Sequence, residues 1–399
     1  MKDVAGGSGG SSARAGVAGG SGGSSPRAGV AVVLAGSLGL GHEMLARSCS
    51  ELLERSGWRA RSLNCMSLLG RRNGGAGERV FGKLIAAPGL YDALHFAHLR
   101  AGSGLAKFMD RAARARLVPS LKAELQREPA DLVLSVFATG AAAAAELKAG
   151  SPPWRSVVLC TDVAVHRLWV AQGTDLFLVT SPAAAASVRR YLPLAEVCVV
   201  PPPVRASFYT APGQEEARAA LGVRLENPCV LVIDSGWGFG SLVESVSALA
   251  DAGLQVLAVA GRQPDVERRL RDLAKTTSRI SAFGFTDRVP ELMAAADLVV
   301  ALPGATTCSE ARVVGRQLLL LDVMPGHGRD NLQHELELGS AHVCGPAPAA
   351  VTASALAIVG DVSRPALPDC SLPGWEPAFA AALAKIGLDL CPEGLAVAS

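Results

Sequence analysis

Short apolar runs alternate with helix-length amphipathic segments from residue 30 onward. The runs Val30–Gly36, Asp131–Ala138, Ser156–Asp162 and Asp175–Ser181 are almost continuously apolar, and RARSLNCMS, between the first two, is a further strand candidate. Runs of this kind are typical of parallel strands with both faces covered by helices. The segment after the first run has apolar spacing suited to a helix ending at Gly57. We therefore predict a doubly wound α/β unit for the first half.

The same alternation begins again after a proline-rich stretch. Pro201–Tyr209 opens with three consecutive prolines, which neither a helix interior nor a central strand accommodates. A second series of apolar runs follows, with helix-length segments between them: Cys229–Ser241, Leu254–Arg262, Arg279–Phe285, Ala296–Gly304 and Arg316–Met324. Two α/β halves joined by a hinge leave a cleft between them, where open α/β sheets bind ligands. Function is therefore expected in that cleft.

The first residues fall outside this pattern. Residues 4–16 read VAGGSGGSSARAG, and residues 17–29 repeat the unit with one change, Ala13 becoming Pro26. Gly/Ser repeats of this kind are flexible and cannot bury a core, so we predict a disordered tail over 1–29. The remaining chain divides into a domain over 30–202, a domain over 203–366 and a terminal segment over 367–399.

Composition and charge narrow the class of protein. The chain has 399 residues, of which 49% are apolar and 19% charged, as expected for a well-packed protein of two domains. Lys and Arg (38) exceed Asp and Glu (36) by only two, so no nucleic-acid partner is expected. The nine cysteines include no Cys-x-x-Cys pair, which favours reduced thiols over a metal site. Neither a signal peptide nor a membrane span is recognisable, so we expect a cytoplasmic protein.

A glycine-rich loop follows the first apolar run. It contains Gly36, Gly39 and Gly41 and ends at His42, where backbone N–H groups and a helix dipole favour an anion or a polarised oxygen. The glycine spacing is G-x-x-G-x-G, and the next strand has no carboxylate, so a dinucleotide site is disfavoured. The dipole favours the neutral imidazole of His42, which is the form a general base needs. Alternatively, His42 caps the helix locally.

Three later loops also carry polar groups at strand ends. Asp234–Ser241 is glycine-rich and opens a helix, Pro303–Ala311 places hydroxyls and Glu310 near another helix start, and Gly326–Asn331 follows the strand LLLLDVM. The duplicated glycine loop predicts an anion site in each half, although such glycines also serve turns. Glu310 suits a diol, or alternatively the helix dipole.

One segment is strongly basic. Residues 70–118 contain nine Lys or Arg against three Asp or Glu, with apolar and aromatic residues interleaved. This pattern is suited to an anionic membrane surface, or alternatively to a solvated helix face.

The ordered series of motifs resembles one family of glycosyltransferases. Thr161–Trp169 resembles a T-D-x-x-x-H-x-x-W signature, Pro201–Phe208 a G-I-P-V-x-x-x-F interdomain segment, and Gly284–Val300 a nucleotide-binding stretch. Together with the glycine loop before His42, they are similar to the GT-B family of monogalactosyldiacylglycerol synthases, processive diacylglycerol glucosyltransferases and the MurG-like lipid II N-acetylglucosaminyltransferase. The resemblance implies two Rossmann-like domains, the first binding the acceptor and the second the nucleotide sugar, with the last helix returning to the first domain.

The resemblance also assigns a donor site. Pro303–Glu310 is similar to the motif K-P-G-G-x-T-x-x-E, with Leu302 and Ala305 as departures, and Gly326–Asn331 to G-Q-E-x-x-N without its Gln and Glu. Glu310 is thereby implied to hold the ribose hydroxyls of UDP. The donor-binding residues implied are Gly236, Gly238, Phe239, Gly240, Gly261, Arg262, Phe285, Gly304, Thr306, Thr307, Glu310, His327, Asp330 and Asn331. Gly39 and Gly41 are implied in the acceptor loop.

The implied reaction is an inverting transfer of a hexose or N-acetylhexosamine from a UDP-sugar co-substrate to a hydroxyl of diacylglycerol or a polyprenyl-type lipid. We expect His42 to act as base, with Asp162 and His166 as orienting partners or rivals. Neither a metal nor another cofactor is required. The expected partners are the UDP-sugar, the lipid or lipid-linked acceptor, and an anionic membrane contacted through residues 70–118, which places the protein peripherally on the inner face of the cell membrane.

Three alternatives remain open. The high Ala, Arg and Gly content suggests a GC-rich bacterial genome, in which a glycosyltransferase of specialised-metabolite (glycolipid antibiotic) biosynthesis is a natural expectation. A UDP-sugar epimerase on the same scaffold would use carboxylates in the cleft. A degenerate nucleotide-sugar-binding protein would explain Leu302, Ala305 and the missing Gln and Glu.

Overall fold

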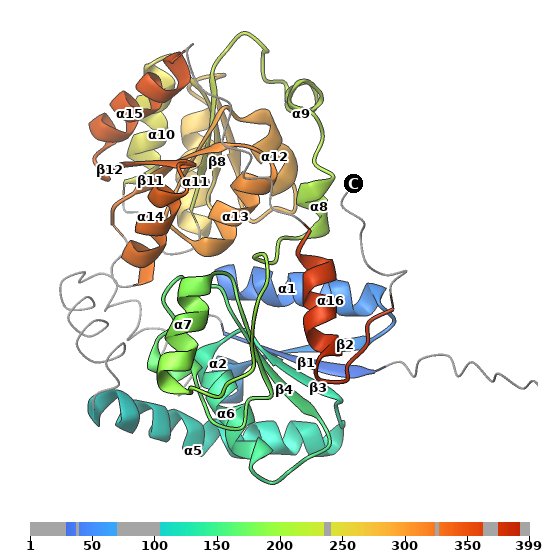
Figure 1. Cartoon of the computed structure of the whole chain (residues 1–399). Helices are drawn as coiled ribbons and strands as arrows, with labels where there is room; N and C mark the ends of the chain where they lie inside the picture. Colours follow the sequence, from blue (N-terminus) through green and yellow to red (C-terminus); the bar gives the residue numbers. More distant parts are fainter. Residues whose placement is uncertain are drawn as a thin grey trace, which may run out of the picture.

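The computed structural model describes residues 29–36, 40–69, 104–234, 241–323, 327–361 and 374–391. These form two halves, each built on a parallel six-stranded sheet with helices packed around it (Figure 1). The predicted fold class is confirmed. The glycine-rich tail, most of the basic segment and the loop after Asp234 lie outside the described residues.

The first half contains strands β1 to β6 in the order β2-β1-β3-β4-β5-β6. The central residues of β1, β3, β4, β5 and β6 are buried because helices cover the faces of the sheet, whereas β2, at the edge, is half-buried or exposed. The elements are β1 (Val30–Ala35), α1 (Leu40–Arg55), β2 (Arg59–Asn64), α2 (Cys65–Leu68), α5 (Gly104–Arg127), β3 (Leu132–Ser135), α6 (Ala138–Lys148), β4 (Arg155–Cys160), η2 (Arg167–Trp169), β5 (Leu176–Val179), α7 (Pro182–Tyr191) and β6 (Val197–Val199).

Helix α1 illustrates how the sequence pattern sets the packing. Leu45, Cys49, Leu52 and Leu53 recur at helical spacing and are buried against the sheet. Glu43 and Arg47 lie on the opposite side of the helix. Their side chains are partly exposed to solvent and form ion pairs with residues of the second half. The helix ends at Arg55, two residues before Gly57, whose φ of 80° is a left-handed conformation that glycine tolerates.

The second half contains β7 to β12 in the order β12-β11-β10-β7-β8-β9. Read from the other end, this is the order of a dinucleotide-binding Rossmann sheet, whose ligand crevice lies at the switch between β7 and β10. The elements are α8 (Ala206–Tyr209), α9 (Gln214–Leu221), β7 (Cys229–Ile233), α10 (Leu242–Asp251), β8 (Gln255–Val259), α11 (Pro264–Ala274), β9 (Ile280–Phe283), α12 (Val289–Ala295), β10 (Leu298–Ala301), α13 (Ala305–Val313), β11 (Gln317–Leu321), α14 (His327–Glu337), β12 (Ala341–Cys344) and α15 (Pro348–Gly360).

The last helix, α16 (Trp375–Ala384), packs on the first half rather than on the half that precedes it in sequence (Figure 1). Trp375 and Phe379 are fully buried in the core beneath α1. Glu376 pairs with Arg55 at 2.5 Å, and the Trp375 indole N–H donates to the carbonyl of Val204 at 2.8 Å. The helix therefore joins α1 to the hinge segment between the halves.

Two strands were not predicted from the pattern. β6 has three residues and β12 four, and each lies at the edge of its sheet. β6 is apolar but only three residues long, and the proline-rich stretch follows almost directly. β12 contains His342 and is partly exposed, so it lacks the apolar run that marks the central strands. In the part of the chain that the structure describes, no helix is both long and apolar enough to cross a membrane.

Candidate active site between the two halves

One pocket lies where the carboxyl ends of the two sheets face each other. The first half contributes α1 and the loop after β4, the hinge contributes Arg205, and the second half contributes loops after β7, β8, β9 and β10. Ten residues predicted for the site line it: Gly41, His42, Asp162, Gly261, Phe285, Gly304, Thr306, Thr307, Glu310 and Asn331. The fold thus gathers residues that are up to 290 positions apart in sequence, from Gly41 to Asn331.

His42 is held in a defined tautomer. Its Nδ1 lies 2.9 Å from the carbonyl oxygen of Val136, which follows β3. A carbonyl only accepts hydrogen bonds, so this contact places the proton of the neutral ring on Nδ1 and makes Nε2 the basic nitrogen. The ring also packs edge-on against Phe137, with centroids 5.4 Å apart. The imidazole is therefore oriented by the sheet beneath it.

The TDVAVHRLW segment forms a small cluster beside His42. The buried Trp169 donates its indole N–H to Asp162 Oδ2 at 3.1 Å, which orients the carboxylate in the pocket wall. The Trp169 ring lies 6.3 Å from the ring of His42 and 6.2 Å from that of His166. His166 itself lies outside the pocket lining. Of the two predicted partners of His42, the structure places Asp162 in the pocket and separates His166 from it.

Glu310 is a buried carboxyl at the opposite wall. It lies in the middle of α13 and not in its first turn, which rules out the dipole-partner alternative. Burial raises its pKa from 4.5 to about 7, against the opposing effect of Arg205, whose guanidinium contacts Oε1 at 3.4 Å. The carboxyl is therefore poised between its neutral and ionised forms near neutral pH.

Two hydroxyls and an amide complete this wall. α13 begins at Ala305, so Thr306 and Thr307 lie in its first turn, where unpaired backbone N–H groups and the dipole favour an anion. Asn331 in α14 is 4% exposed, and its Nδ2 donates to the carbonyl of Pro303 at 3.2 Å. Its Oδ1 is buried and has no hydrogen-bond partner among the described residues. A ligand hydroxyl in the pocket would satisfy that acceptor.

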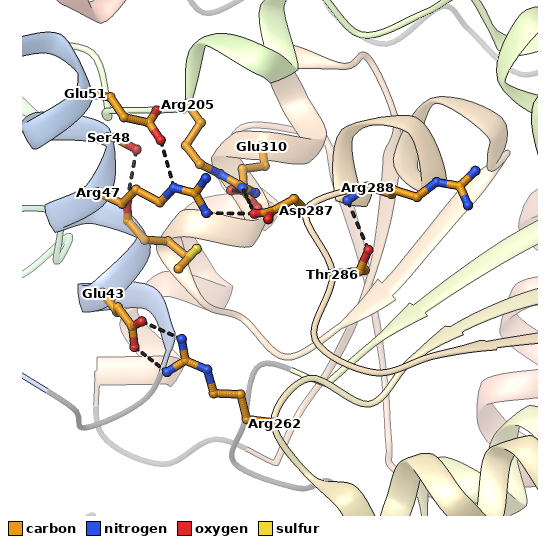
Figure 2. Close-up of polar contacts among 11 residues, drawn as sticks. Glu43, Arg47, Ser48, Glu51, Arg205, Arg262, Thr286, Asp287, Arg288 and Glu310 are labelled. Carbon is orange, nitrogen blue, oxygen red and sulfur yellow. Dashed lines mark hydrogen bonds and ion pairs between the residues drawn. The ribbon is translucent and has the colours of Figure 1, made fainter.

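Arg262 has a role that its motif did not predict. Both of its terminal nitrogens contact the Glu43 carboxylate across the cleft, at 2.7 and 2.6 Å (Figure 2). Its guanidinium also stacks on the ring of Phe285, 4.5 Å from the ring centroid. It lies outside the pocket lining. Neighbouring Gly261 has φ 58°, and a Cβ there would lie 3.1 Å from the carbonyl of Asp234, so glycine permits the close turn that lines the pocket.

Other predicted residues lie away from the pocket or outside the described residues. Asp330 is in α14 but not in the pocket lining, and His327 begins α14 with its side chain outside the description. Of the site residues predicted in the two glycine loops, Gly39, Gly236, Gly238, Phe239 and Gly240 lie outside the described residues.

Three charged residues of the pocket were not assigned a role from the sequence. They are Arg205 of the hinge, Asp234 after β7 and Asp287 after β9. Asp287 also accepts from Arg47 of α1 at 2.7 Å across the cleft (Figure 2). All three stand inside segments quoted from the sequence, Asp287 within Gly284–Val300, so their position at strand ends and in the hinge was an available signal. The Arg47 contact is between residues 240 positions apart and gave none.

Sequence comparison agrees with the motif resemblance. Residues 239–343 match the glycosyltransferase family 28 C-terminal domain. Processive diacylglycerol beta-glucosyltransferase of Bacillus pumilus is 24% identical over 187 residues, 46% of this chain and 49% of that protein. The Bacillus cereus protein of the same name is 25% identical over 228 residues, 56% of this chain and 58% of that protein. The chain thus spans about half the length of the curated relatives it matches. The suspected resemblance is confirmed at the level of the family.

Structural comparison agrees on the fold. MurG of Acinetobacter baumannii superposes with a TM-score of 0.50 at 16% identity, covering 82% of this chain and 89% of that one. UDP-GlcNAc 2-epimerase of Neisseria meningitidis superposes with a TM-score of 0.55 at 12% identity, covering 89% and 99%. At such identities the likeness establishes the GT-B fold alone.

Proposed function

We propose that the chain is an inverting glycosyltransferase that moves a hexose or N-acetylhexosamine from a UDP-sugar to a hydroxyl of a lipid or lipid-linked acceptor. The single observation that carries the proposal is the pocket, in which His42 of one half, with Nε2 as its basic nitrogen, faces the buried Glu310 and the first turn of α13 of the other. The curated relatives of this chain are named diacylglycerol glucosyltransferases, and these names support a lipid acceptor.

His42 is the proposed base. As the acceptor oxygen forms its bond to the anomeric carbon, Nε2 takes the hydroxyl proton, and the Val136 carbonyl stabilises the resulting imidazolium through Nδ1–H. Asp162 lies in the same wall, oriented by Trp169, and adds a negative charge that favours the imidazolium. The bond from the anomeric carbon to the diphosphate breaks in the same step, and UDP leaves with the electron pair.

The second half is proposed to hold the donor. The ionised Glu310 accepts hydrogen bonds from two adjacent ribose hydroxyls, and the first turn of α13 stabilises charge that develops on the diphosphate. Asn331 Oδ1 accepts from a sugar hydroxyl. The glycine loop with Gly236, Gly238, Phe239 and Gly240 is proposed for the same diphosphate, and Gly39 and Gly41 for the acceptor.

The membrane surface remains part of the proposal. Helix α5 begins inside the basic segment 70–118 and carries the exposed Arg111 and Arg116, whereas Arg114 pairs with Glu146 at 2.9 Å. Basic side chains near anionic headgroups each add about 1 kcal/mol of attraction. We propose that this segment attaches the protein peripherally to the inner face of the cell membrane, close to its lipid acceptor.

The experiment is UDP release from a panel of UDP-sugars, with and without vesicles containing diacylglycerol and anionic lipid. Wild-type protein should release UDP with one sugar and only with acceptor vesicles, and His42→Gln should lose that release. His342→Gln, an exposed position on β12, is the matched control and should behave as wild type. Release with a soluble acceptor alone would instead indicate a glycosyltransferase of specialised-metabolite biosynthesis. Binding of UDP without turnover under any condition would indicate a degenerate binding protein.

A UDP-sugar epimerase is the second candidate. It is favoured by the four acidic side chains of the pocket, Asp162, Asp234, Asp287 and Glu310. An epimerase would convert a UDP-sugar without acceptor vesicles, and the product would be a new sugar. Chromatography of the nucleotide sugars in the same assay separates the two reactions.

A further inference from the structure

A row of alternating charges runs from α1 into the pocket. Glu51 pairs with Arg47 at 2.8 Å, and Arg47 contacts Asp287 at 2.7 Å. Asp287 lies 4.0 Å from Arg205, which contacts Glu310 at 3.4 Å (Figure 2). The row crosses both halves and the hinge between them. Each basic group lies between two acidic ones, so no two like charges are adjacent in it.

Arg205 is the buried member that reaches the pocket. Its side chain is 7% exposed, and its guanidinium packs 4.8 Å above the ring of Phe208, itself fully buried in the core of the second half. The preceding carbonyl, that of Val204, is held by the Trp375 indole. Arg205 is therefore fixed from both sides before any ligand arrives, and its terminal nitrogen points at the Glu310 carboxylate.

We propose that Arg205 is a positioning residue of the nucleotide-sugar site, which holds the Glu310 carboxylate in place for two adjacent donor hydroxyls. The cross-cleft pair Arg47–Asp287 in turn holds the Arg205 side chain in position. This inference rests on the proposed function. It assigns the hinge a part in donor recognition, because the contact needs the hinge segment, the loop after β9 and α13 in one place.

The physical reason is the cost of burying Glu310. A carboxyl accepts hydrogen bonds from two hydroxyls most strongly when it is ionised, and burial opposes ionisation. The charged or titratable groups around it are Arg205 of the hinge, Asp287 after β9, Asp234 after β7, and His42 and Asp162 of the first half, with Cys308, Arg312 and Glu335 nearer its own helix. Arg205 contacts Glu310 directly and favours its ionised form. Its removal leaves Glu310 neutral at the pH where the wild type is ionised.

The test is UDP affinity measured by isothermal titration calorimetry between about pH 6 and pH 9. Wild-type affinity should fall as the pH drops through about 7, the pKa of Glu310. In Arg205→Met the fall should move to higher pH, with affinity roughly 10-fold weaker at neutral pH and partial recovery at the alkaline end. Arg205→Lys, which keeps a positive charge, should lie between the two. Asp287→Asn should lose about 2-fold to 5-fold, because it acts through Arg205.

Two comparisons make the result decisive. Arg288→Met is the matched control, since Arg288 is in the same loop as Asp287 but pairs with Glu291 on the surface. It should leave affinity and pH profile unchanged. In a Glu310→Gln background, Arg205→Met should cause little further loss, because both act through one contact.

Equal losses from Arg205→Met with and without Glu310 would overturn the inference, because Arg205 would then contact the donor directly. An unchanged pH profile in Arg205→Met and Arg205→Lys would also overturn it. If Arg205→Met fails to fold, Arg205→Lys and Asp287→Asn decide the matter alone. Failure of wild-type protein to bind UDP or any UDP-sugar at every pH would instead reject the proposed function.

Discussion

The two halves share an architecture but supply different chemistry to the pocket. Each has a parallel six-stranded sheet with its carboxyl ends at the cleft. The first half contributes a histidine with a fixed tautomer and a carboxylate oriented by Trp169, groups suited to moving a proton. The second contributes a helix N-terminus, a buried carboxyl and a buried amide, groups suited to holding a polar ligand. The two halves can therefore share one layer architecture and still supply different groups, because the side chains of the pocket come from the loops and helix ends rather than from the sheets.

The largest predicted effect is on turnover, at His42. If the first half supplies the base, His42→Gln should lower kcat by about 100-fold to 10,000-fold while leaving UDP affinity within about 2-fold of wild type. Steady-state UDP release and calorimetry of UDP binding check the two parts. A variant that loses affinity and keeps kcat would show that His42 holds the ligand and so would break the division between the halves.

The next effect concerns stability and again separates the halves. The core of the first half is completed by α16 from the end of the chain, whereas that of the second half is built from elements contiguous in sequence. Phe379→Ala should lower the free energy of unfolding by about 3 to 5 kcal/mol, because it empties a fully buried site. Chemical denaturation monitored by fluorescence measures it. Native-state hydrogen exchange should show the loss in β1 to β5 and not in β7 to β11, and an equal loss in both sheets would contradict this localisation.

A third prediction concerns Glu310 and the pH dependence of stability. Its pKa is about 7 in the folded protein and 4.5 in a peptide, so the native state binds more protons than the unfolded state between these values. Stability of the wild type should therefore fall as pH rises from about 4.5 to 7, and the loss should persist above 7. Relative to wild type, Glu310→Gln should gain about 1 to 3 kcal/mol between pH 5 and pH 8. Parallel pH profiles of the two proteins in urea denaturation would refute the raised pKa.

The smallest effect is expected at the exposed pair that joins the halves. Glu43 and Arg262 form a two-bond contact, but both side chains are about half exposed, at 41% and 50%. Each single charge removal should cost about 0.2 to 1 kcal/mol of stability. The exchanged double variant Glu43→Arg with Arg262→Glu should recover part of the loss, measured by thermal unfolding at low salt. Absence of recovery would indicate that packing on Phe285, and not charge, holds Arg262 in place.

The sequence predicted the fold because central strands leave a strong signal. Runs such as that of β1 or β7 are apolar throughout, since both faces of each strand are covered. The edge strand β6 is apolar but only three residues long, and β12 is partly exposed, so the sequence did not reveal either. The packing of α16 on the first half was available only through the family resemblance, because its partners are more than 300 residues away in α1.

The candidate site was predictable only in part. His42, Asp162 and Glu310 follow strand ends, and parallel sheets bring those ends together, so their common pocket follows from the pattern. The tautomer of His42 depends on one carbonyl, that of Val136, which no residue type can reveal. The contacts of Arg205 and Arg47 depend on how the two halves pack against each other, and the local sequence around these residues does not encode that packing.

One measurement tests the central claim most directly: kcat and donor dissociation constant determined together for His42→Gln and Glu310→Gln, with the UDP-sugar that wild-type protein turns over. The division of labour predicts that His42→Gln loses kcat with an unchanged dissociation constant, whereas Glu310→Gln weakens donor binding by roughly 10-fold or more at alkaline pH. Equal effects of both variants on both quantities would contradict the claim that the first half moves the proton and the second holds the donor.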